Sequence, residues 1–568
     1  MCRHFQLLLL VCLSAGLPAL CQDAATSTEP PKDLTRETEA GIPVTDPVTI
    51  ARCGGCHRAD ANKNLSRISW IRTTPEGWQE AIKRMAMLNG VKLSPEDGRH
   101  IVRYLANEHG LAPEETESVR WFLEMWQPQA EPVPNMTLRR ACATCHAFVK
   151  PRTWRRSAAE WQLLKNMHIG YFPMSQFVAF RPEMGPRPED PATPRKQPVD
   201  EAMEFFSKNF GLYSPEWSNW RAQFSEPDLS GKWFVSANEP GKGKYFGEMT
   251  VTKTAPGEYN TSMTLVRAKD GSKLDFPGKA MLYTGYEWRG AAKAEPFGAM
   301  RQVMAVAADQ ATMKGRWFWG GYQEFGMTVN VQRESKDVTV LGTDVVSLPA
   351  GTKGAAMKIF GRSLPADLSA GDIRLGAGVT VSKATPVSPE QVNVVVDVDP
   401  KVFAGKRNIV IRGRAATDAF SVYDRIEYIK ITPETALAHV GGVVGKKGYF
   451  QFEAHAFSNG ADGQPNTPDD VDLGPVPAQW SIEEFISHNS DNDKEFVGNI
   501  DDNGLFTPAG DGPNPARRLS TDNVGDVWVV AKYKGANAAK PLLEAKTYLV
   551  VTVPDFLRFD APELGEGK

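Results

Sequence analysis

Two Cys-x-x-Cys-His motifs constrain the fold of this chain more than any other feature of its sequence. They read Cys53-Gly-Gly-Cys56-His57 and Cys142-Ala-Thr-Cys145-His146. The chain has 7 cysteines, and the other three are Cys2, Cys12 and Cys21. The motif cysteines must therefore be interpreted together with the N-terminal segment that holds the rest.

Residues 1–21 have the pattern of a secretory signal peptide. Arg3 precedes the apolar run Leu7–Leu13, and small residues follow up to Ala19. This run is too short to span a bilayer. We expect cleavage after Cys21; a lipoprotein anchor at Cys21 is less favoured because Leu20 stands where a small residue is expected. The exported chain then keeps only the four motif cysteines, so none is spare for a disulfide.

Each motif is a signature of covalent c-type haem attachment. Two thiols at this spacing add across the two vinyl groups of one porphyrin, and the adjacent histidine offers its imidazole to the iron. A zinc site is disfavoured because no further Cys/His pairs stand at ligand spacing. The sequence therefore predicts two covalently bound haem c groups, held by Cys53, Cys56, Cys142 and Cys145.

A weak internal repeat indicates which residue ligates the far face of each iron. Two segments, 78–87 and 161–168, begin with Trp and have an amphipathic helical pattern. A second pair of helical runs ends at Gly110 and Gly211, which are stop signals for helices. This order of motif, Trp-bearing helix and terminal helix is that of a small cytochrome c fold, made twice.

Aligning the two tryptophans places Met85 opposite His168. We therefore assign His57 and Met85 to the first haem, and His146 and His168 to the second. Met87 remains an alternative to Met85. Met174 remains an alternative to His168, because it follows His146 at the same interval as Met85 follows His57.

The remaining histidines and several methionines have no place in the repeated pattern. We expect His100 and His109 on a solvated helix face, His439, His455 and His488 in structural roles, and Met125, Met136 and Met184 in core packing.

The assigned ligands have a redox consequence. A thioether ligand favours ferrous iron, whereas a second imidazole leaves the reduction potential lower. Our hypothesis is that electrons fall from the His146/His168 haem to the His57/Met85 haem. With both irons six-coordinate, the haems would transfer electrons and would not perform bond chemistry.

The rest of the chain divides into segments by composition and periodicity. A length of 568 residues suggests about four domains. We predict a signal peptide (1–21), a flexible Pro/Thr/Glu-rich arm (22–47), an all-α dihaem cytochrome c domain (48–225, with lobes of about 48–120 and 121–225), an antiparallel β-barrel (226–349), an immunoglobulin-like β domain (350–431) and a C-terminal β-sandwich (432–568). The barrel interior is expected to be filled by side chains.

Charge argues against nucleic acid as a partner. The chain has 65 Lys+Arg and 68 Asp+Glu, a net charge of −3, without long basic runs. No segment beyond the leader could span a membrane. The acidic stretches Asp462–Asp472 and Asp491–Asp502 could supply ligands for Ca²⁺, but they lack an EF-hand loop, and solvated loops are the favoured interpretation.

The dihaem segment with three following β domains resembles the haem-bearing α subunit of quinohemoprotein amine dehydrogenase, a periplasmic bacterial enzyme. The resemblance covers essentially the whole mature chain. Its specific parts are Arg52–His57, Trp78–Met85, Leu93–Tyr104, Cys142–His146 and the three β modules.

This resemblance implies a heterotrimeric oxidoreductase of the periplasm. A small γ subunit would carry a cysteine tryptophylquinone that oxidises primary amines, and a β-propeller β subunit would pack alongside. The present chain would collect electrons from the quinone and pass them to a blue-copper protein or a cytochrome c. The family also pairs one bis-His haem with one His/Met haem. Because all mature cysteines are used for haem, this chain cannot build the quinone itself. No catalytic residue is therefore expected on this chain.

Two other functions remain open from the sequence. A stand-alone dihaem enzyme, such as a peroxidase, would need an open or displaceable iron site. A haem-bearing, β-rich binding protein would have no stable partner that carries a quinone.

Overall fold

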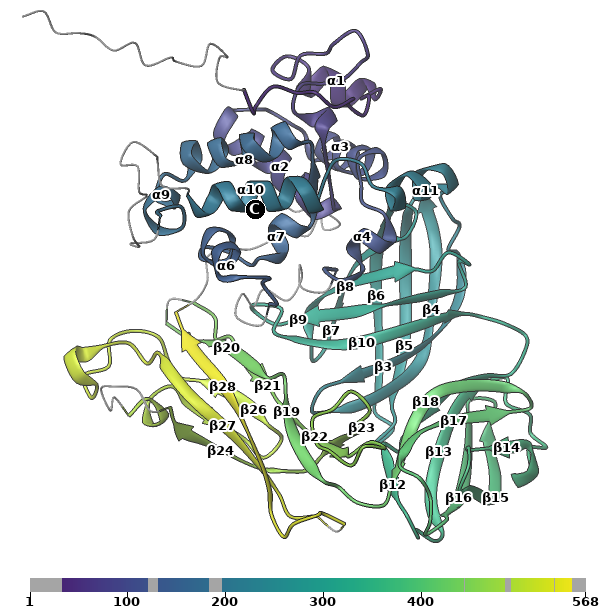
Figure 1. The fold of residues 1–568 in the computed structure, drawn as a ribbon. Coiled ribbons are helices and arrows are strands. Elements are labelled where there is room, and N and C mark those ends of the chain that lie inside the picture. The colour runs from purple at the N-terminus through teal and green to yellow at the C-terminus, as the bar shows by residue number, and fades with distance from the viewer. Residues whose placement is uncertain are drawn as a thin grey trace, which may run out of the picture.

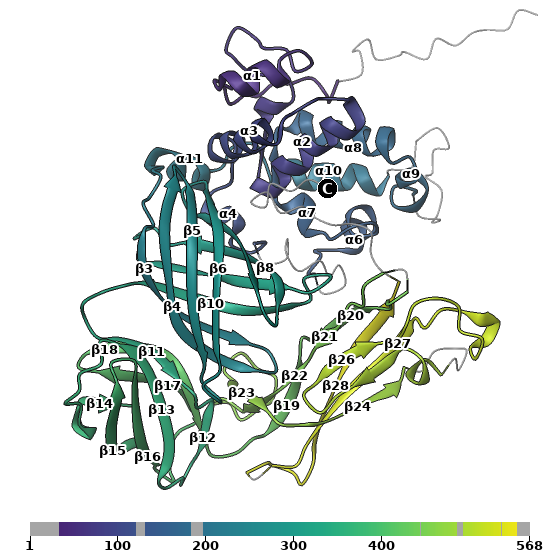
Figure 2. The same ribbon diagram turned by 180° about the vertical axis from the view of Figure 1, so that it is seen from behind.

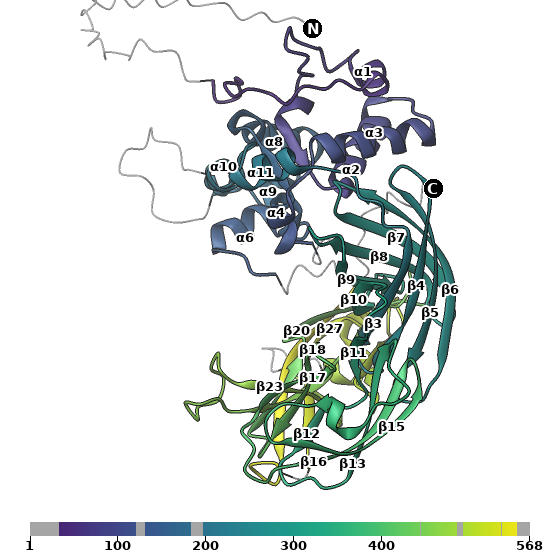
Figure 3. The same ribbon diagram turned by 90° about the vertical axis from the view of Figure 1, so that its right-hand side faces the viewer.

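A helical domain, an eight-stranded barrel and two further β domains make up the chain (Figure 1). The computed structural model describes residues 33–120, 131–182, 197–443, 445–485, 492–535 and 537–553. Seen from the side, the helices lie above one end of the barrel and the other β domains lie below it (Figure 3). The fold is therefore helical first and β-rich afterwards, as the sequence predicts.

The helical domain consists of short helices and one two-stranded sheet. The helices are α1 (Pro47–Cys53), α2 (Pro75–Asn89), α3 (Pro95–Glu108), α4 (Pro113–Glu117), α6 (Met136–Cys142), α7 (Val149–Arg152), α8 (Ala158–Tyr171), α9 (Ser175–Val178), α10 (Pro198–Asn209) and α11 (Pro215–Gln223); the strands are β1 (Ile71–Thr73) and β2 (Trp154–Arg156). Each Cys-x-x-Cys-His motif begins at the last residue of a short helix, α1 or α6.

The internal repeat is present in the structure. The Trp78 indole donates to the His109 carbonyl (3.1 Å), and the Trp161 indole donates to the Phe210 carbonyl (3.0 Å). Both carbonyls belong to the residue that caps the terminal helix of the lobe, α3 or α10. The aligned tryptophans thus make the same contact in both lobes.

The two lobes are joined by the pairing of β1 with β2. Arg72 stands opposite Arg155 in this antiparallel pair, and both contact the Glu115 carboxylate, at 2.9 and 3.1 Å. Burial would raise the pKa of Glu115, but the Arg72 hydrogen bonds and charge, with that of Arg155, outweigh burial and lower the pKa to about 2. One buried carboxylate therefore pairs with an arginine from each lobe.

The terminal glycines of the repeat are not left-handed caps, and Gly110 serves for close packing. Helices α3 and α10 end one residue before the cap, at Glu108 and Asn209, and neither Gly110 nor Gly211 has a positive φ. A Cβ on Gly110 would lie 2.1 Å from the Ala106 carbonyl oxygen and 2.7 Å from Thr284 of the barrel. Gly110 thus lets the lobe approach the barrel.

The end of the segment expected to be a flexible arm is part of the helical domain. The Glu39 carbonyl accepts from the Trp70 indole (2.8 Å), and the Ala40 carbonyl accepts from the Tyr213 hydroxyl (2.9 Å). Ile42 and Val44 are buried. These contacts hold residues 39–44 against the domain, so this stretch is ordered, unlike the predicted arm.

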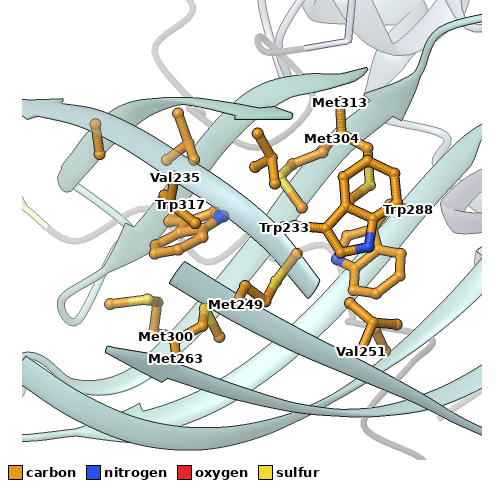
Figure 4. Packing of buried hydrophobic residues seen from close by; sticks show 14 of the residues in the cluster. Trp233, Val235, Met249, Val251, Met263, Trp288, Met300, Met304, Met313 and Trp317 are labelled. Atoms are coloured by element: carbon orange, nitrogen blue, oxygen red, sulfur yellow. The ribbon is translucent and has the colours of Figure 1, made fainter. Parts of the chain in front are cut away.

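The first β domain is a closed barrel of antiparallel strands (Figure 2). The strands are β3 (Gly231–Glu239), β4 (Gly243–Ala255), β5 (Glu258–Arg267), β6 (Lys273–Tyr283), β7 (Glu287–Ala294), β8 (Gly298–Val306), β9 (Thr312–Trp319) and β10 (Phe325–Arg333). Trp233, Trp288 and Trp317 fill its interior together with methionines such as Met249 and Met304 (Figure 4). The predicted filled interior is confirmed, as is usual for a barrel of this strand number.

The two remaining β domains are built from β11–β18 and β19–β28. Their strands are β11 (Thr339–Thr343), β12 (Ser347–Pro349), β13 (Ala355–Arg362), β14 (Ile373–Arg374), β15 (Val379–Ser388), β16 (Gln391–Val398), β17 (Gly405–Ile411), β18 (Arg414–Tyr423), β19 (Tyr428–Thr432), β20 (Thr435–His439), β21 (Phe450–Gln451), β22 (Glu453–Ser458), β23 (Val471–Val476), β24 (Gln479–Glu484), β25 (Gly498–Ile500), β26 (Leu505–Pro508), β27 (Gly525–Tyr533) and β28 (Leu543–Thr552).

The boundaries of these domains differ from the expected ones. Strands β11 and β12 pair with β13 and β18, so the second β domain begins before residue 350. Strand β19 pairs with β22, so the last domain begins before residue 432. In the second domain, one core cluster joins residues from two four-stranded sheets, β11-β13-β16-β15 and β12-β18-β17-β14.

The His455 ring in the last domain is held by two carboxylates. Its Nδ1 lies 3.1 Å from both Asp472 oxygens, and its Nε2 lies 3.5 Å from the Glu453 carboxylate. Burial would lower the pKa of His455, but hydrogen bonds and charges from Asp472 and Glu453 raise it to about 9.

We expect this cluster to make the domain's stability pH-dependent. An unfolded histidine titrates near 6.5, so the stabilisation is complete below about pH 6.5 and is lost as pH rises through about 9. Because Asp472 is partly exposed, we expect this stabilisation to amount to about 2 kcal/mol. Urea unfolding of His455→Gln and the parent chain should show their difference in unfolding free energy shrinking by that amount between about pH 6 and pH 10. A constant difference would contradict the raised pKa of His455. His100→Gln is the control, because the His100 ring is half exposed.

Candidate haem sites

The first Cys-x-x-Cys-His motif lines a cavity of about 540 Å³ in the first lobe. Cys53, Cys56, His57 and Met85 all face this cavity, and Trp78 is among its apolar walls. The two thiols, the imidazole and the thioether come from α1, the turn that follows it, and α2. The structure thus brings all four residues predicted for the first haem to one cavity.

The candidate ligands of this cavity are oriented by their other polar contacts. His57 Nδ1 lies 2.8 Å from the Ser66 carbonyl oxygen, which can only accept, so Nδ1 carries the proton and Nε2 keeps its lone pair for a metal. Met85 is half-buried, and the Asn89 amide contacts its sulfur at 3.7 Å. Met87 is 71% exposed and does not line the cavity, so the structure favours Met85.

The second motif lines a cavity of about 370 Å³ in the second lobe. Cys142, Cys145, His146 and His168 face it, and so does Met174. Both volumes fall in the range of cavities that hold cofactors. Both candidates for the far-face ligand of the second haem are therefore present at the cavity.

The two imidazoles of the second cavity are oriented in the same way as His57. Nδ1 of His146 lies 3.0 Å from the Ala147 carbonyl oxygen, and Nδ1 of His168 lies 2.9 Å from the Leu164 carbonyl oxygen. Burial lowers the pKa of His146 to about 4 and also lowers the pKa of His168. Both rings are thus neutral near pH 7, which is the form that ligates a metal.

The donor set of each cavity fits a c-type haem. All four cysteines are unbridged. Burial raises the pKa of Cys142 to about 12 and also raises the pKa of Cys53, whereas a reactive redox thiol needs a lowered pKa. When bound, haem supplies one-electron redox chemistry at each cavity, and the protein supplies thioether anchors and axial ligands.

Four residues line both cavities and form a common wall between them. They are Arg84 on α2, Trp154 and Arg156 on β2, and Met167 on α8. The ends of α2 and α8 also meet, where the Asn89 amide contacts the Tyr171 hydroxyl at 3.3 Å (Figure 1). This wall was not predicted from the sequence. The position of Arg84 next to Met85 was a signal for it, but nothing local indicated that Arg156 is buried.

Two expectations for residues outside the cavities are wrong. His109 is buried and not solvated; its ring packs edge-on against Trp78 with centroids 6.0 Å apart, and burial lowers its pKa to about 3. Met136 is 72% exposed and not part of a core. His100 is on the surface as expected, 2.8 Å from Asp46.

Several other predictions fall partly or wholly outside the described residues. These are the signal peptide, Met125, Met184, His488 and the start of the acidic stretch at Asp491. In the part of the chain that the structure describes, no group of three or more His, Cys, Asp or Glu side chains could hold a metal ion. No helix among the described residues is long and apolar enough to cross a membrane.

Two solved structures show remote likenesses to parts of the chain. A de novo designed fluorescence-activating β-barrel is 16% identical and covers 18% of this chain and 93% of its own, with a TM-score of 0.16. Human mucin-like protocadherin EC1-2 is 12% identical and covers 39% of this chain and 100% of its own, with a TM-score of 0.16. No curated protein matches the chain.

Family models match from residue 44 to residue 564, domain by domain. The haem-binding model of the quinohemoprotein amine dehydrogenase alpha subunit matches residues 44–183, and the models of its domains II, III and IV match 226–334, 337–424 and 429–564. The haem-binding match covers both Cys-x-x-Cys-His motifs, the lining of the first cavity, and the lining of the second cavity except Val199, Met203 and Phe206. The chain therefore belongs to the family of quinohemoprotein amine dehydrogenase alpha subunits, the haem-binding subunits of a multisubunit oxidoreductase.

Proposed function

We propose that this chain is the dihaem c electron-transfer subunit of a periplasmic amine dehydrogenase. It would take electrons from a cysteine tryptophylquinone on a small partner subunit during the oxidative deamination of primary amines. It would pass them to a blue-copper protein or a cytochrome c, with a β-propeller subunit completing a heterotrimer. The partners are inferred from the family. The compartment is inferred from the family and from the predicted signal peptide.

The observation that carries this proposal is the pair of adjoining cavities with equivalent donor sets. Each holds two thiols and one imidazole from a Cys-x-x-Cys-His motif, and each holds a second side chain that can ligate iron. A centre capped on both faces has no position for a substrate. Because the cavities share a wall, haems bound in them would lie next to each other, as electron transfer between them requires.

The role of this chain is to hold and orient the two centres. Carbonyl groups fix the imidazole tautomers, so that each Nε2 can bind iron. The only cysteines among the described residues line the two cavities, so none is available there to build a quinone. The amine would therefore be oxidised on another subunit.

Mass spectrometry of the purified complex tests this proposal. We expect the mass of this chain to include two haem groups, and we expect Cys142→Ala/Cys145→Ala to carry one. Quinone-specific redox staining should mark a much smaller band, after haem peroxidase activity has been quenched. Fewer than two haems on the parent chain, or quinone staining on this chain alone, would refute the proposal.

A further inference from the structure

The wall between the two cavities contains two arginines that are only partly satisfied by the protein. The Nε atoms of Arg84 and Arg156 are both buried, and neither has a hydrogen-bond partner among the residues that the structure describes. A buried donor without an acceptor is costly, and such a group calls for an explanation, for example a bound water, ion or ligand. Both side chains line both cavities.

Each of the two carboxylates near these arginines is shared with another cation. Glu160 lies 3.8 Å from Arg156, but its other oxygen lies 2.6 Å from Arg67. Glu80 is the carboxylate whose charge acts on Arg84. It forms an ion pair with Lys150 at 2.5 Å. The wall therefore has more positive than negative charge on the side chains that face the cavities.

The Arg156 side chain is held in place without a strong ion pair. Its guanidinium lies over the Trp154 ring at 4.4 Å and near the Trp161 ring at 5.6 Å. Such cation–π contacts hold a guanidinium group against the faces of the rings. This arrangement suits recognition of a carboxylate, for which Arg is the preferred residue.

We propose that Arg84 and Arg156 form one carboxylate-binding site that takes the propionate groups of the haems in both cavities. This inference rests on the proposed binding of two haems. It adds that both haems share one cationic wall, which offsets part of the negative charge of their propionates. Because positive charge near an iron favours the ferrous state, the wall would raise both reduction potentials.

Spectroelectrochemical titration of the intact complex tests the site. We expect Arg84→Gln and Arg156→Gln each to lower both midpoint potentials. The expected change is about tenfold or more in each reduction equilibrium, which is 59 mV for one electron. Resonance Raman spectra should show shifted propionate bending bands in both variants. Arg99→Gln removes the same charge from the exposed face of α3 and should change neither readout.

Lysine variants separate charge from hydrogen bonding. Arg84→Lys and Arg156→Lys should keep the potentials near those of the parent chain but still shift the propionate bands. Unchanged potentials and bands in the glutamine variants, or a shift of one couple alone, would overturn the shared site. If Arg156→Gln does not fold, the potentials and propionate bands of Arg84→Gln decide whether the site is shared. The haem count by mass spectrometry separates this test from that of the proposed function. A chain with fewer than two haems refutes the proposed function and not the arginine site.

Discussion

Replacing Glu76 with glutamine is expected to destabilise the junction between the helical domain and the barrel by about 3–5 kcal/mol. Glu76 lies near the start of α2, and one of its oxygens contacts Arg289 Nε at 2.6 Å and Arg301 Nη2 at 2.9 Å. Arg289 also contacts Glu287 at 3.0 Å. All four side chains are at most 5% exposed.

The expected loss is large because the charges are fully buried. Burial would raise the pKa of Glu76, but Arg289 and Arg301 hold it well below its usual range, so the carboxylate stays charged. Burial instead raises the pKa of Glu287, so Glu287 compensates the charges of the two arginines less well than Glu76 does. Removing the Glu76 charge leaves two buried guanidinium groups without their shared carboxylate, and breaking a buried pair costs more than the pair contributes.

The chain offers a matched control for this variant. Glu96 follows Ser94-Pro95 at the start of α3, as Glu76 follows Thr74-Pro75 at the start of α2, but Glu96 is exposed. Glu96→Gln should change stability by no more than about 0.5 kcal/mol. Urea unfolding followed by haem absorbance gives both values. Equal midpoints for the two variants would show that the buried network adds no net stability.

The parts of the structure that the sequence predicts well are those with local signals. The aligned Trp78 and Trp161 made the repeat visible, and the structure gives them the same hydrogen bond. Alternating apolar residues predicted the strands of the barrel, for example over 245–251 within β4. The motif histidines could be placed because the spacing of a covalent attachment site is fixed by the porphyrin.

The parts that the sequence does not predict depend on contacts between distant segments. His109 and Arg156 have polar side chains, and only the assembled domain shows that both are buried. The Glu76–Arg289 pair joins a helix to a strand of another domain. Strand β12 lies within the segment 226–349 that the sequence predicts as the barrel, but its parallel pairing with β18 assigns it to the next domain.

Replacing His168 with methionine is expected to raise the lower of two haem potentials by more than 59 mV, which is tenfold in the reduction equilibrium. The reason is that a thioether stabilises ferrous iron relative to an imidazole. The same variant should strengthen the near-infrared charge-transfer band that reports sulfur ligation. Met85→His should have the reverse effect, lowering the higher potential and removing that band from the parent spectrum.

Met174→Leu is the control that separates the two candidates at the second cavity. Met174 lines that cavity but is 65% exposed, whereas the His168 ring packs against Phe180 with centroids 5.9 Å apart and has its Nδ1 fixed by the Leu164 carbonyl. We expect Met174→Leu to leave both potentials and the charge-transfer band unchanged. If Met174 were the ligand, His168→Met would leave both potentials unchanged and Met174→Leu would convert one haem to high spin. That result would also remove the difference in axial ligands on which the direction of electron flow depends, because both irons would then have one imidazole and one thioether.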